Sequence, residues 1–339
     1  MQEKAFLPRR DFLKYCAAFP FLIRMAGFEK DYIHTVKGQI KPAELGVTLI
    51  HEHVLVDFIG ADKISPDRWN HEDVIKKVLP YLLEAKSKGI KSMVECTPAF
   101  LGRDVVLLEK LAARSGLNLL TNTGYYGASN NKYLPSWAFT ETAEQLAKRW
   151  TEEFNNGIEQ TSVKPGFIKI GVNDGHLSGL HQKLIKAAAL THLKTGLTIC
   201  SHTGPAVPAN EQIEILKNLN VDPAAFVWVH ARGSREEFVK TAASGCWISL
   251  DGINEENAAE HAELILFLKK EGFLKKILIS HDAGWYQPGE PDGGKFRGYT
   301  AISEKLLPVL KQKGMNDAAI EQLMVLNPAA AFTVSIRRH

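Results

Sequence analysis

The chain has few of the features that mark membrane, nucleic-acid-binding or disulfide-rich proteins. Its N-terminal apolar stretch, residues 15–27, is too short to span a bilayer as a stable anchor. Charges nearly cancel, with 41 Lys and Arg against 38 Asp and Glu, and the small basic excess lies within the first 30 residues. Because no basic stripe follows, we expect neither nucleic-acid binding nor stable membrane insertion.

Cysteine is scarce, and its positions are widely spaced. The four residues, Cys16, Cys96, Cys200 and Cys246, form no Cys-x-x-Cys pair. This argues against both a zinc ribbon and a disulfide framework. We expect these side chains to behave as buried small hydrophobes.

The length and apolar content are those of a globular enzyme. The chain has 339 residues, of which 45% are hydrophobic and 23% charged. A barrel of eight β/α units fills about 250 residues or more as a single domain, so the length does not force a division.

Residues 1–28 resemble an export signal. Arg9-Arg10, followed by Phe12-Leu13-Lys14 and the apolar stretch, is similar to a twin-arginine signal, which predicts a periplasmic protein. The alternative is the N-terminal amphipathic helix of a cytoplasmic protein, because Arg24 interrupts the apolar stretch and no clear cleavage site follows it. We exclude this segment from the prediction of the fold.

The remaining residues, 29–339, alternate between strand and helix patterns. Residues 33–40 predict a short β-hairpin with its turn near Gly38. Helices are expected at 71–88, 104–115, 140–158 and 178–195. From residue 47 onward the short apolar strands number eight, the last seven at 92–97, 118–123, 166–171, 197–202, 226–230, 246–251 and 276–282. This pattern predicts an α/β fold, a single (β/α)8 TIM barrel.

Two histidines mark the first barrel strand. His51 and His53 alternate with Glu52, so on a strand both imidazoles project from one face while Glu52 projects from the other. This is a geometry that metal ligands adopt, but an isolated His-x-His is equally typical of a half-exposed strand. The helical zinc-protease motif is excluded, because Leu55 stands four residues after His51.

Further polar residues occur at matching positions on later strands. Lys169 lies inside strand four, while His202, His230 and Asp282 end strands five, six and eight. Active sites of such barrels lie at the carboxyl ends of the strands, so this regularity favours a metal site over core histidines. Lys169 would otherwise be a snorkelling or paired lysine; its neutral amine can add carbon dioxide to give a carbamate, which bridges two cations as a carboxylate does. His281 should point to the opposite side of its strand and be structural.

Several motifs together resemble the phosphotriesterase family of the amidohydrolase superfamily. They are Thr35-Val-Lys-Gly-Gln-Ile40, Leu45-Gly46, His51-Glu-His53, Gly102-Arg103-Asp104, Gly166-Phe-Ile-Lys169, His202-Thr-Gly204, Ser280-His-Asp282 and Asn327-Pro-Ala329. The resemblance spans about residues 33 to 333.

The resemblance implies a distorted barrel with two divalent metals and a homodimer. It places His51, His53 and Asp282 on one metal and His202 and His230 on the other, with a carboxylated Lys169 and a hydroxide as bridges. In this arrangement the hydroxide attacks the substrate and Asp282 accepts its proton. His, Asp and carbamate ligands suit Zn, Mn, Co or Fe, and zinc is the default expectation.

The residues that determine the substrate depart from the known patterns. Paraoxon-degrading members of the family carry an Asp shortly after the sixth-strand His and a His in the seventh loop; here residues 230–234 and 251–257 contain neither. Lactonases are similar at 102–104 and 123–126 but have Arg where this chain has Gly252. We expect a substrate pocket formed by Tyr126, Trp285, Tyr286 and Arg297, the last three in a Gly- and Pro-rich loop that resembles a lid.

The sequence therefore predicts a binuclear metal-dependent hydrolase of carboxylic esters or lactones, with phosphotriesterase activity as a side reaction. An organophosphate triesterase is the first alternative. A catalytically idle barrel that only binds a ligand is an alternative of another class. The complete set of candidate ligands argues against the idle barrel, because a binding protein has no need of Lys and Asp at these positions.

Overall fold

The computed structural model describes residues 31–339, and the region 1–30 lies outside the described residues. The predicted signal at 1–28 and Cys16 therefore cannot be compared with the structure, and export stays a prediction. Within the described part of the chain, no helix is both long and apolar enough to cross a membrane.

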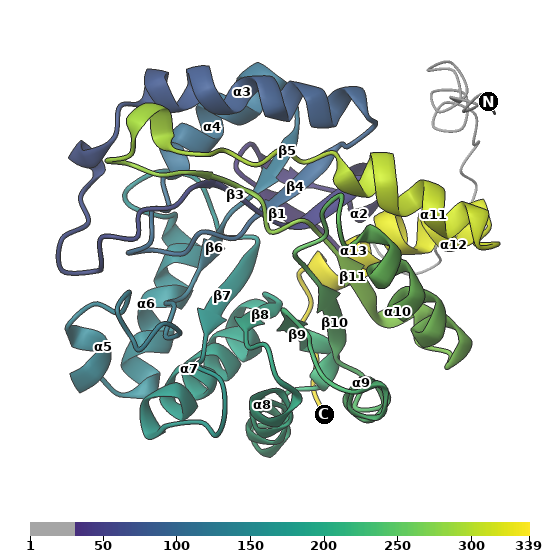
Figure 1. The fold of residues 1–339 in the computed structure, drawn as a ribbon. Helices are drawn as coiled ribbons and strands as arrows, with labels where there is room; N and C mark the ends of the chain where they lie inside the picture. The colour runs from purple at the N-terminus through teal and green to yellow at the C-terminus, as the bar shows by residue number, and fades with distance from the viewer. Residues whose placement is uncertain (1–30) are drawn as a thin grey trace.

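A ring of parallel strands forms the centre of the fold, and helices lie around it (Figure 1). The six-stranded sheet has the order β11-β10-β9-β8-β7-β6, and the four-stranded sheet has the order β12-β3-β4-β5. The strands are β3 (Thr48–Leu55), β4 (Ser92–Glu95), β5 (Asn118–Leu120), β6 (Asn122–Thr123), β7 (Phe167–Gly171), β8 (Ile199–His202), β9 (Phe226–Val229), β10 (Trp247–Leu250), β11 (Ile277–Ile279) and β12 (Gly284–Tyr286).

Two junctions join the sheets. β5 and β6 are one predicted strand interrupted at Thr121. On the other side, the backbone N–H of Asp282, just beyond β11, donates to the carbonyl of His51 in β3 at 3.0 Å. The predicted distorted TIM barrel is thus confirmed. The short strand β12, which pairs with β3 after the eighth strand, was not predicted.

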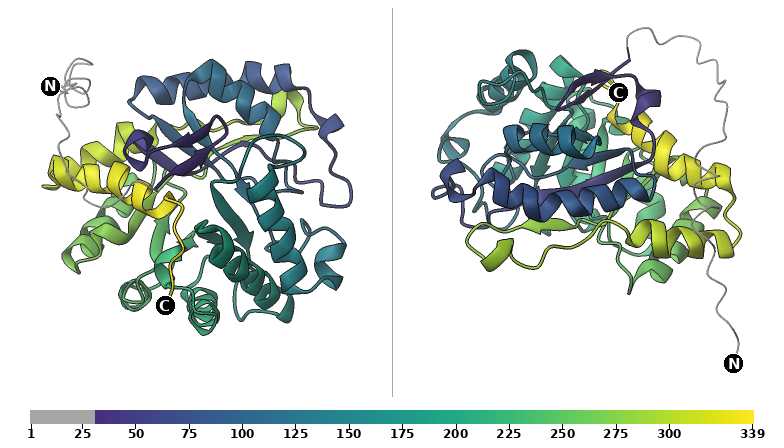
Figure 2. Two further views of the ribbon diagram at one scale, coloured as in Figure 1. Left: turned by 180° about the vertical axis from the view of Figure 1, so that it is seen from behind. Right: turned by 90° about the horizontal axis from the view of Figure 1, so that it is seen from above.

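Helices follow most of the strands and cover their outer faces (Figures 1 and 2). They are α2 (Pro42–Leu45), α3 (His71–Ser87), α4 (Val105–Ser115), α5 (Trp137–Thr140), α6 (Ala143–Asn156), α7 (Gly179–Thr195), α8 (Ala206–Asn218), α9 (Arg235–Ala242), α10 (Ala258–Lys270), α11 (Leu307–Gln312), α12 (Asp317–Glu321) and α13 (Asn327–Phe332). Short 3-10 or π turns occupy Pro66–Arg68, Pro223–Ala225, Leu274–Lys276, Pro291–Gly293, Ile302–Leu306 and Gln322–Leu326.

One predicted helix is shorter in the structure. The expected helix 140–158 corresponds to α6, which begins only at Ala143 because Thr142 adopts an extended backbone before it. Its hydroxyl accepts a hydrogen bond from the N–H of Gln145, whose side chain in turn accepts from the N–H of Thr142. This capping box starts a new helix at Ala143.

The N-terminal hairpin closes the lower end of the barrel. β1 (Ile33–Thr35) pairs antiparallel with β2 (Gly38–Ile40), as predicted. His34 contacts the carbonyl of Pro165, just before β7, at 3.1 Å, and the N–H of Val36 donates to Leu119 in β5. Seen from behind, the hairpin lies next to the C-terminal helices (Figure 2). The carboxyl ends of the strands are therefore at the opposite, open end.

The core has two main layers. One hydrophobic cluster fills the barrel interior above the hairpin and includes Ile50, Phe167 and Phe332, and a larger one lies between strands and helices. Cys96, Cys200 and Cys246 are free and buried in these layers, so the expectation of buried hydrophobic cysteines is confirmed for these three.

Candidate metal centre

Polar side chains from three parts of the barrel meet at its open end. Nε2 of His51 lies 3.2 Å from Nζ of Lys169 and 3.8 Å from a carboxylate oxygen of Asp282. The same oxygen of Asp282 lies 3.1 Å from Nε2 of His53. Thus β3, β7 and the segment after β11 each contribute to one small cluster.

The two remaining predicted ligands adjoin this cluster. The ring centres of His202 and His230 are 4.5 Å apart, and that of His230 is 4.8 Å from the ring centre of His51. All six side chains singled out in the sequence therefore lie in one place, although they come from positions up to 231 residues apart.

An irregularity in β3 turns His51 toward this cluster. Leu49 packs in the outer cluster and Ile50 in the barrel interior, so regular alternation would place His51 outside. However, the pairing with β4 shifts between Leu49 and Glu52, where β3 advances by three residues and β4 by two. The extra residue allows Ile50 and His51 both to face the interior, as bulges near active sites commonly do.

Unusual backbone conformations direct two other ligands inward. Val229 belongs to the barrel-interior cluster, so the following residue, His230, would point outward on a regular strand. His230 instead has a φ of 56°, and Asp282 has a φ of 50°. Such left-handed conformations cost about 1–3 kcal/mol each in non-glycine residues and are concentrated at functional sites.

Asp251, directly after β10, is a candidate site residue that the sequence analysis missed. Its side chain is fully buried, and its two oxygens lie 3.5 Å from Nδ1 of His51 and 3.6 Å from Nδ1 of His230. It also accepts hydrogen bonds from the N–H of His230 at 2.8 Å and the hydroxyl of Ser249 at 2.7 Å. Its place at the end of strand seven, matching His202 and His230 on the preceding strands, was the signal that could have revealed it.

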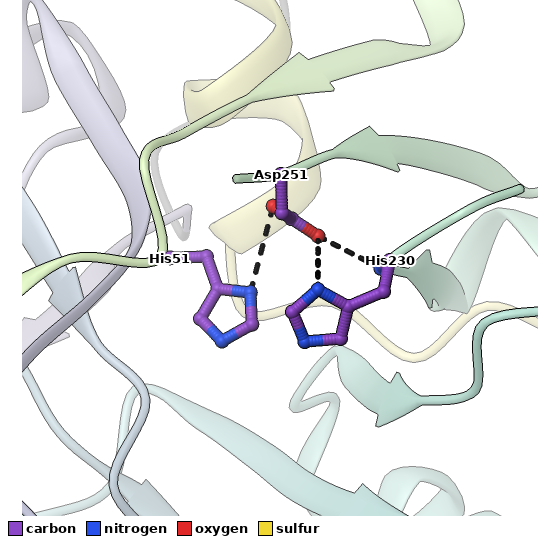
Figure 3. Close-up of side chains that lie close together, drawn as sticks. All are labelled: His51, His230 and Asp251. Atoms are coloured by element: carbon purple, nitrogen blue, oxygen red, sulfur yellow. Dashed lines mark hydrogen bonds and ion pairs between the residues drawn. The ribbon is translucent and has the colours of Figure 1, made fainter. Parts of the chain in front are cut away.

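Figure 3 shows how Asp251 relates to the two histidines. Both imidazoles turn Nδ1 toward its carboxylate, which leaves Nε2 of each ring on the far side. Geometry alone allows two ligand groups, His51 with His53 and Asp282, or His51 with His230 and Asp251. We assign Asp251 to the support of the histidines, because a carboxylate on the second ring nitrogen is the usual partner of a metal-binding His.

Two other buried carboxylates, Glu95 and Glu52, support His53 and the segment around Asp282. Nδ1 of His53 lies 2.8 Å from the hydroxyl of Thr97, which donates to Glu95. Glu52 accepts hydrogen bonds from the hydroxyl of Ser280, from the N–H and Nδ1 of His281, and from the N–H of Ala283. It thereby fixes the backbone on both sides of Asp282. The prediction that His281 is structural is confirmed.

The electrostatic environment favours the protonation states that metal ligands need. Burial lowers the pKa of His51 and His202, and it lowers the pKa of His230 to about 4, so these imidazoles are neutral at neutral pH. Burial alone would raise the pKa of Asp282, but His51 and His53 outweigh it and keep the carboxylate ionised.

The donor set fits divalent transition-metal ions. Neutral imidazoles and an ionised carboxylate are the common ligands of such ions. Lys169 is only 1% exposed, and within residues 31–339 it forms no ion pair with a carboxylate. A buried ammonium without such a partner is costly, and Nζ of Lys169 has Nε2 of His51 as a neighbour at 3.2 Å.

The predicted pocket residues divide into two groups. The ring of Tyr126 lies 5.1 Å from His202, and that of Trp285 lies 5.8 Å from His53, both in edge-to-face contact. Arg297 stacks on Trp285 and donates to the carbonyl of Asp282. Tyr286 packs instead on the outer hydrophobic cluster, with its ring against Gly293, so the structure does not bring it to the centre.

Comparison with known proteins identifies the family of this chain. The model of the phosphotriesterase family matches residues 31–332. The chain belongs to the phosphotriesterase family. The predicted family and the prediction of an enzyme are therefore confirmed.

Several known proteins are similar to this chain over nearly their whole length. An aryldialkylphosphatase from Saccharolobus solfataricus is 28% identical, covering 88% of this chain and 98% of the relative. A phospho-furanose lactonase from Mycoplasmopsis synoviae is 25% identical, covering 92% and 94%. The solved structure of a mutant organophosphorus hydrolase from Deinococcus radiodurans is 26% identical and superposes with a TM-score of 0.79, covering 88% and 97%.

Proposed function

We propose that the protein is a binuclear metal-dependent hydrolase of carboxylic esters or lactones, with phosphotriesterase activity as a side reaction. The observation that carries this proposal is the meeting of His51, His53, Lys169, His202, His230 and Asp282 at the open end of the barrel. The names of the relatives, which include a lactonase and a phosphatase of aryl dialkyl phosphates, support this range of substrates.

The proposed ligand assignment follows the positions of the side chains. His51, His53 and Asp282 would hold one ion and His202 and His230 the other, with Lys169, as a carbamate, between them. Two divalent ions supply activated water and polarise the scissile bond. Zinc is our first choice of metal, with Mn, Co and Fe as alternatives.

Within this centre, Asp282 is the proposed proton acceptor. The neighbouring histidines lower the pKa of Asp282, so its carboxylate is ionised and would receive the proton of the attacking water. The four hydrogen bonds to Glu52 fix the neighbouring backbone and keep this carboxylate in place. Tyr126 and Trp285 form apolar walls next to the histidines and would exclude water from the bound substrate.

The residues beyond the ligands favour esters and lactones over phosphotriesters. The Asp and His of the proton relay in paraoxon-degrading enzymes are absent from residues 230–234 and 251–257. Because Gly252 replaces the arginine of typical lactonases, the choice between ester and lactone is open to experiment. An organophosphate triesterase is the second candidate, favoured by the names of the aryldialkylphosphatase and organophosphorus hydrolase relatives.

The test measures metal content and turnover together. The protein is purified, its metal per chain is determined, and it is assayed with a γ-lactone, an aryl acetate and a phosphotriester, with and without chelator. About two metals per chain and chelator-sensitive turnover of the lactone or acetate are expected. Faster turnover of the phosphotriester would instead select the second candidate.

A negative result in both measurements has a separate meaning. If no metal binds and no substrate is turned over, even after reloading with zinc or manganese plus bicarbonate, the barrel is a binding protein and the proposal falls. A homodimer is also proposed from the family resemblance, and light scattering after size-exclusion chromatography tests it.

A further inference from the structure

Aromatic side chains form a continuous wall beside the candidate metal centre. Trp285 contacts His53, and its ring centre lies 5.5 Å from that of Phe58. The ring centre of Phe58 is in turn 6.4 Å from that of Tyr133. We call Trp285, Phe58 and Tyr133 the aromatic wall. It begins beside His53, and its middle member, Phe58, is 38% exposed. Tyr133 at its other end is buried, and its ring centre lies 5.9 Å from that of Tyr126.

A cation lies over each end of this wall. The guanidinium carbon of Arg297 is 4.4 Å from the ring centre of Trp285. The Nζ atom of Lys132 is 5.5 Å from the ring centre of Tyr133 and donates to the carbonyl of Phe58. Both cationic side chains are exposed. Cation–π contacts of this kind hold a charged group in a defined place without neutralising it.

The backbone fixes Arg297 relative to Asp282. Arg297 and Gly284 exchange two backbone hydrogen bonds of 3.0 and 3.1 Å, only two residues after Asp282. One terminal nitrogen of the guanidinium also donates to the carbonyl of Asp282. Trp285, which follows Gly284, has a φ of 75°, a conformation that bulky residues rarely adopt and that a surrounding structure must enforce.

Neither cation is neutralised by the protein. Within residues 31–339, neither Arg297 nor Lys132 forms an ion pair with a carboxylate, whereas two other arginines that follow barrel strands do. Arg68 binds Asp57 and Arg232 binds Asp174. A guanidinium has five N–H donors in a fixed planar fork, and the contact with Asp282 uses only one nitrogen. The remaining donors are free to bind a planar or tetrahedral anion.

We propose that the substrate carries an anionic group, a carboxylate or a phosphate, in addition to its scissile ester or lactone bond, and that Arg297 binds this group. The inference rests on the proposed hydrolytic function and specifies its substrate class. Lys132, at the far end of the aromatic wall, adds long-range attraction. The apolar part of the substrate would lie against Trp285, which contacts both His53 and Arg297.

The test compares matched charged and neutral substrates. The mono-4-nitrophenyl ester of glutaric acid carries a free carboxylate, and methylation of that carboxylate gives its neutral partner. In a second pair of 4-nitrophenyl carboxylic esters, one member carries a phosphate monoester and the other carries the neutral dimethyl ester of that phosphate. Each is assayed with the metal-loaded wild type, Arg297→Gln and Arg297→Lys. Gln retains an N–H donor for the carbonyl of Asp282 but removes the charge. Arg114→Gln, on the outer helix α4, is the control for the loss of an exposed arginine.

We expect Arg297→Gln to lower kcat/KM for an anionic ester by about 10- to 100-fold, mainly through KM, because a hydrogen bond to a charged group contributes about 1.5–3 kcal/mol. The neutral ester should change by less than about 3-fold on the same scale. Arg297→Lys should recover part of the loss, and added salt should reduce the preference of the wild type for the anion. Whichever pair shows the larger effect identifies carboxylate or phosphate as the anion.

Binding without turnover provides an independent measurement. Calorimetry of the metal-loaded protein compares glutarate, which has two carboxylates, with butyrate, which has one. The wild type should bind glutarate more tightly, and Arg297→Gln should abolish the difference. Equal losses for the charged and neutral esters, together with a preference for glutarate over butyrate that Arg297→Gln leaves unchanged, would overturn the inference. If no ester is hydrolysed at all, the proposed function fails, and the calorimetric comparison alone decides whether Arg297 binds anions.

Discussion

The buried carboxylate of Asp251 lies 3.5 Å from Nδ1 of His51, and this ring nitrogen has no other polar partner among the described residues. The second oxygen of Asp251 faces His230 in the same way. One carboxylate thus orients a proposed ligand of each metal ion. It couples the two halves of the candidate centre, so a change at Asp251 should affect both.

We predict that Asp251→Asn weakens metal binding by about 10- to 100-fold, the usual effect of removing a carboxylate behind a metal-binding His. Asn keeps the shape but loses the charge that favours an Nδ1–H tautomer. Competition with a chelator, followed by metal analysis, measures the affinity. Asp174→Asn, an exposed carboxylate paired with Arg232, is the matched control. Unchanged affinity in Asp251→Asn would remove its orienting role.

Lys169→Ala should lose most of the bound metal while the barrel still folds. The side chain is buried beside His51, and in the proposed assignment its removal takes away the only bridging ligand from the protein. Metal per chain and the circular dichroism spectrum are compared with those of Lys148→Ala, an exposed lysine on α6. Full retention of metal in Lys169→Ala would contradict the bridging role.

Trp285 and its neighbour Tyr286 should respond differently to substitution. Trp285 contacts His53, whereas Tyr286 faces the outer hydrophobic cluster. Trp285→Ala should therefore raise KM by about 10-fold or more, as expected for the loss of an aromatic contact of about 1.5 kcal/mol or more. Tyr286→Phe should leave KM unchanged. Steady-state kinetics with the best ester found decide this, and unchanged constants in Trp285→Ala for every substrate would exclude it from the pocket.

A buried histidine far from the metal centre should make stability depend on pH. Nδ1 of His192 lies 2.8 Å from the carbonyl of Leu197, and Nε2 accepts from the N–H of Arg337, so the folded protein holds a neutral ring. Burial lowers the pKa of His192. The stabilisation by neutral His192 is thus fully present above the unfolded pKa of about 6.5. At lower pH only the unfolded state binds the proton, so the free energy of unfolding falls by up to about 1.4 kcal/mol per pH unit.

Chemical unfolding of the metal-free protein between about pH 7.5 and 5 measures this effect, the range being set by the ordinary pKa of His. The Gln side chain in His192→Gln carries both a hydrogen-bond donor and an acceptor but does not titrate. The difference in unfolding free energy between the wild type and this variant should shift in favour of the variant as the pH falls. A difference that is constant over the whole range would show that His192 does not titrate on unfolding.

The sequence by itself determined the kind of fold and the identity of the candidate ligands. Apolar strands and amphipathic helices alternate because a parallel barrel must be buried on both sides of its strands, and this pattern is readable without coordinates. The ends of parallel strands meet at one face, so His202, His230 and Asp282 could be grouped from their positions alone. Local capping chemistry likewise placed the start of α3 at Asn70.

Only the tertiary structure decided how the ligands point and what supports them. Strand periodicity would turn His51 and His230 away from the interior, given the inward positions of Ile50 and Val229. The bulge in β3 and the left-handed backbone at His230 reverse this, and both depend on pairing with other strands.

The residues that contact these candidate ligands could not be predicted from the sequence either. Asp251 meets His51 across 200 residues of chain, and Tyr286 is carried away from its neighbour Trp285 by the alternation of β12. Such contacts arise from the closure of the barrel. Local sequence preferences contain no information about distant neighbours. Only the folded chain therefore shows that Asp251 supports the histidines and that Arg297 and Lys132 have no acidic partner among the described residues.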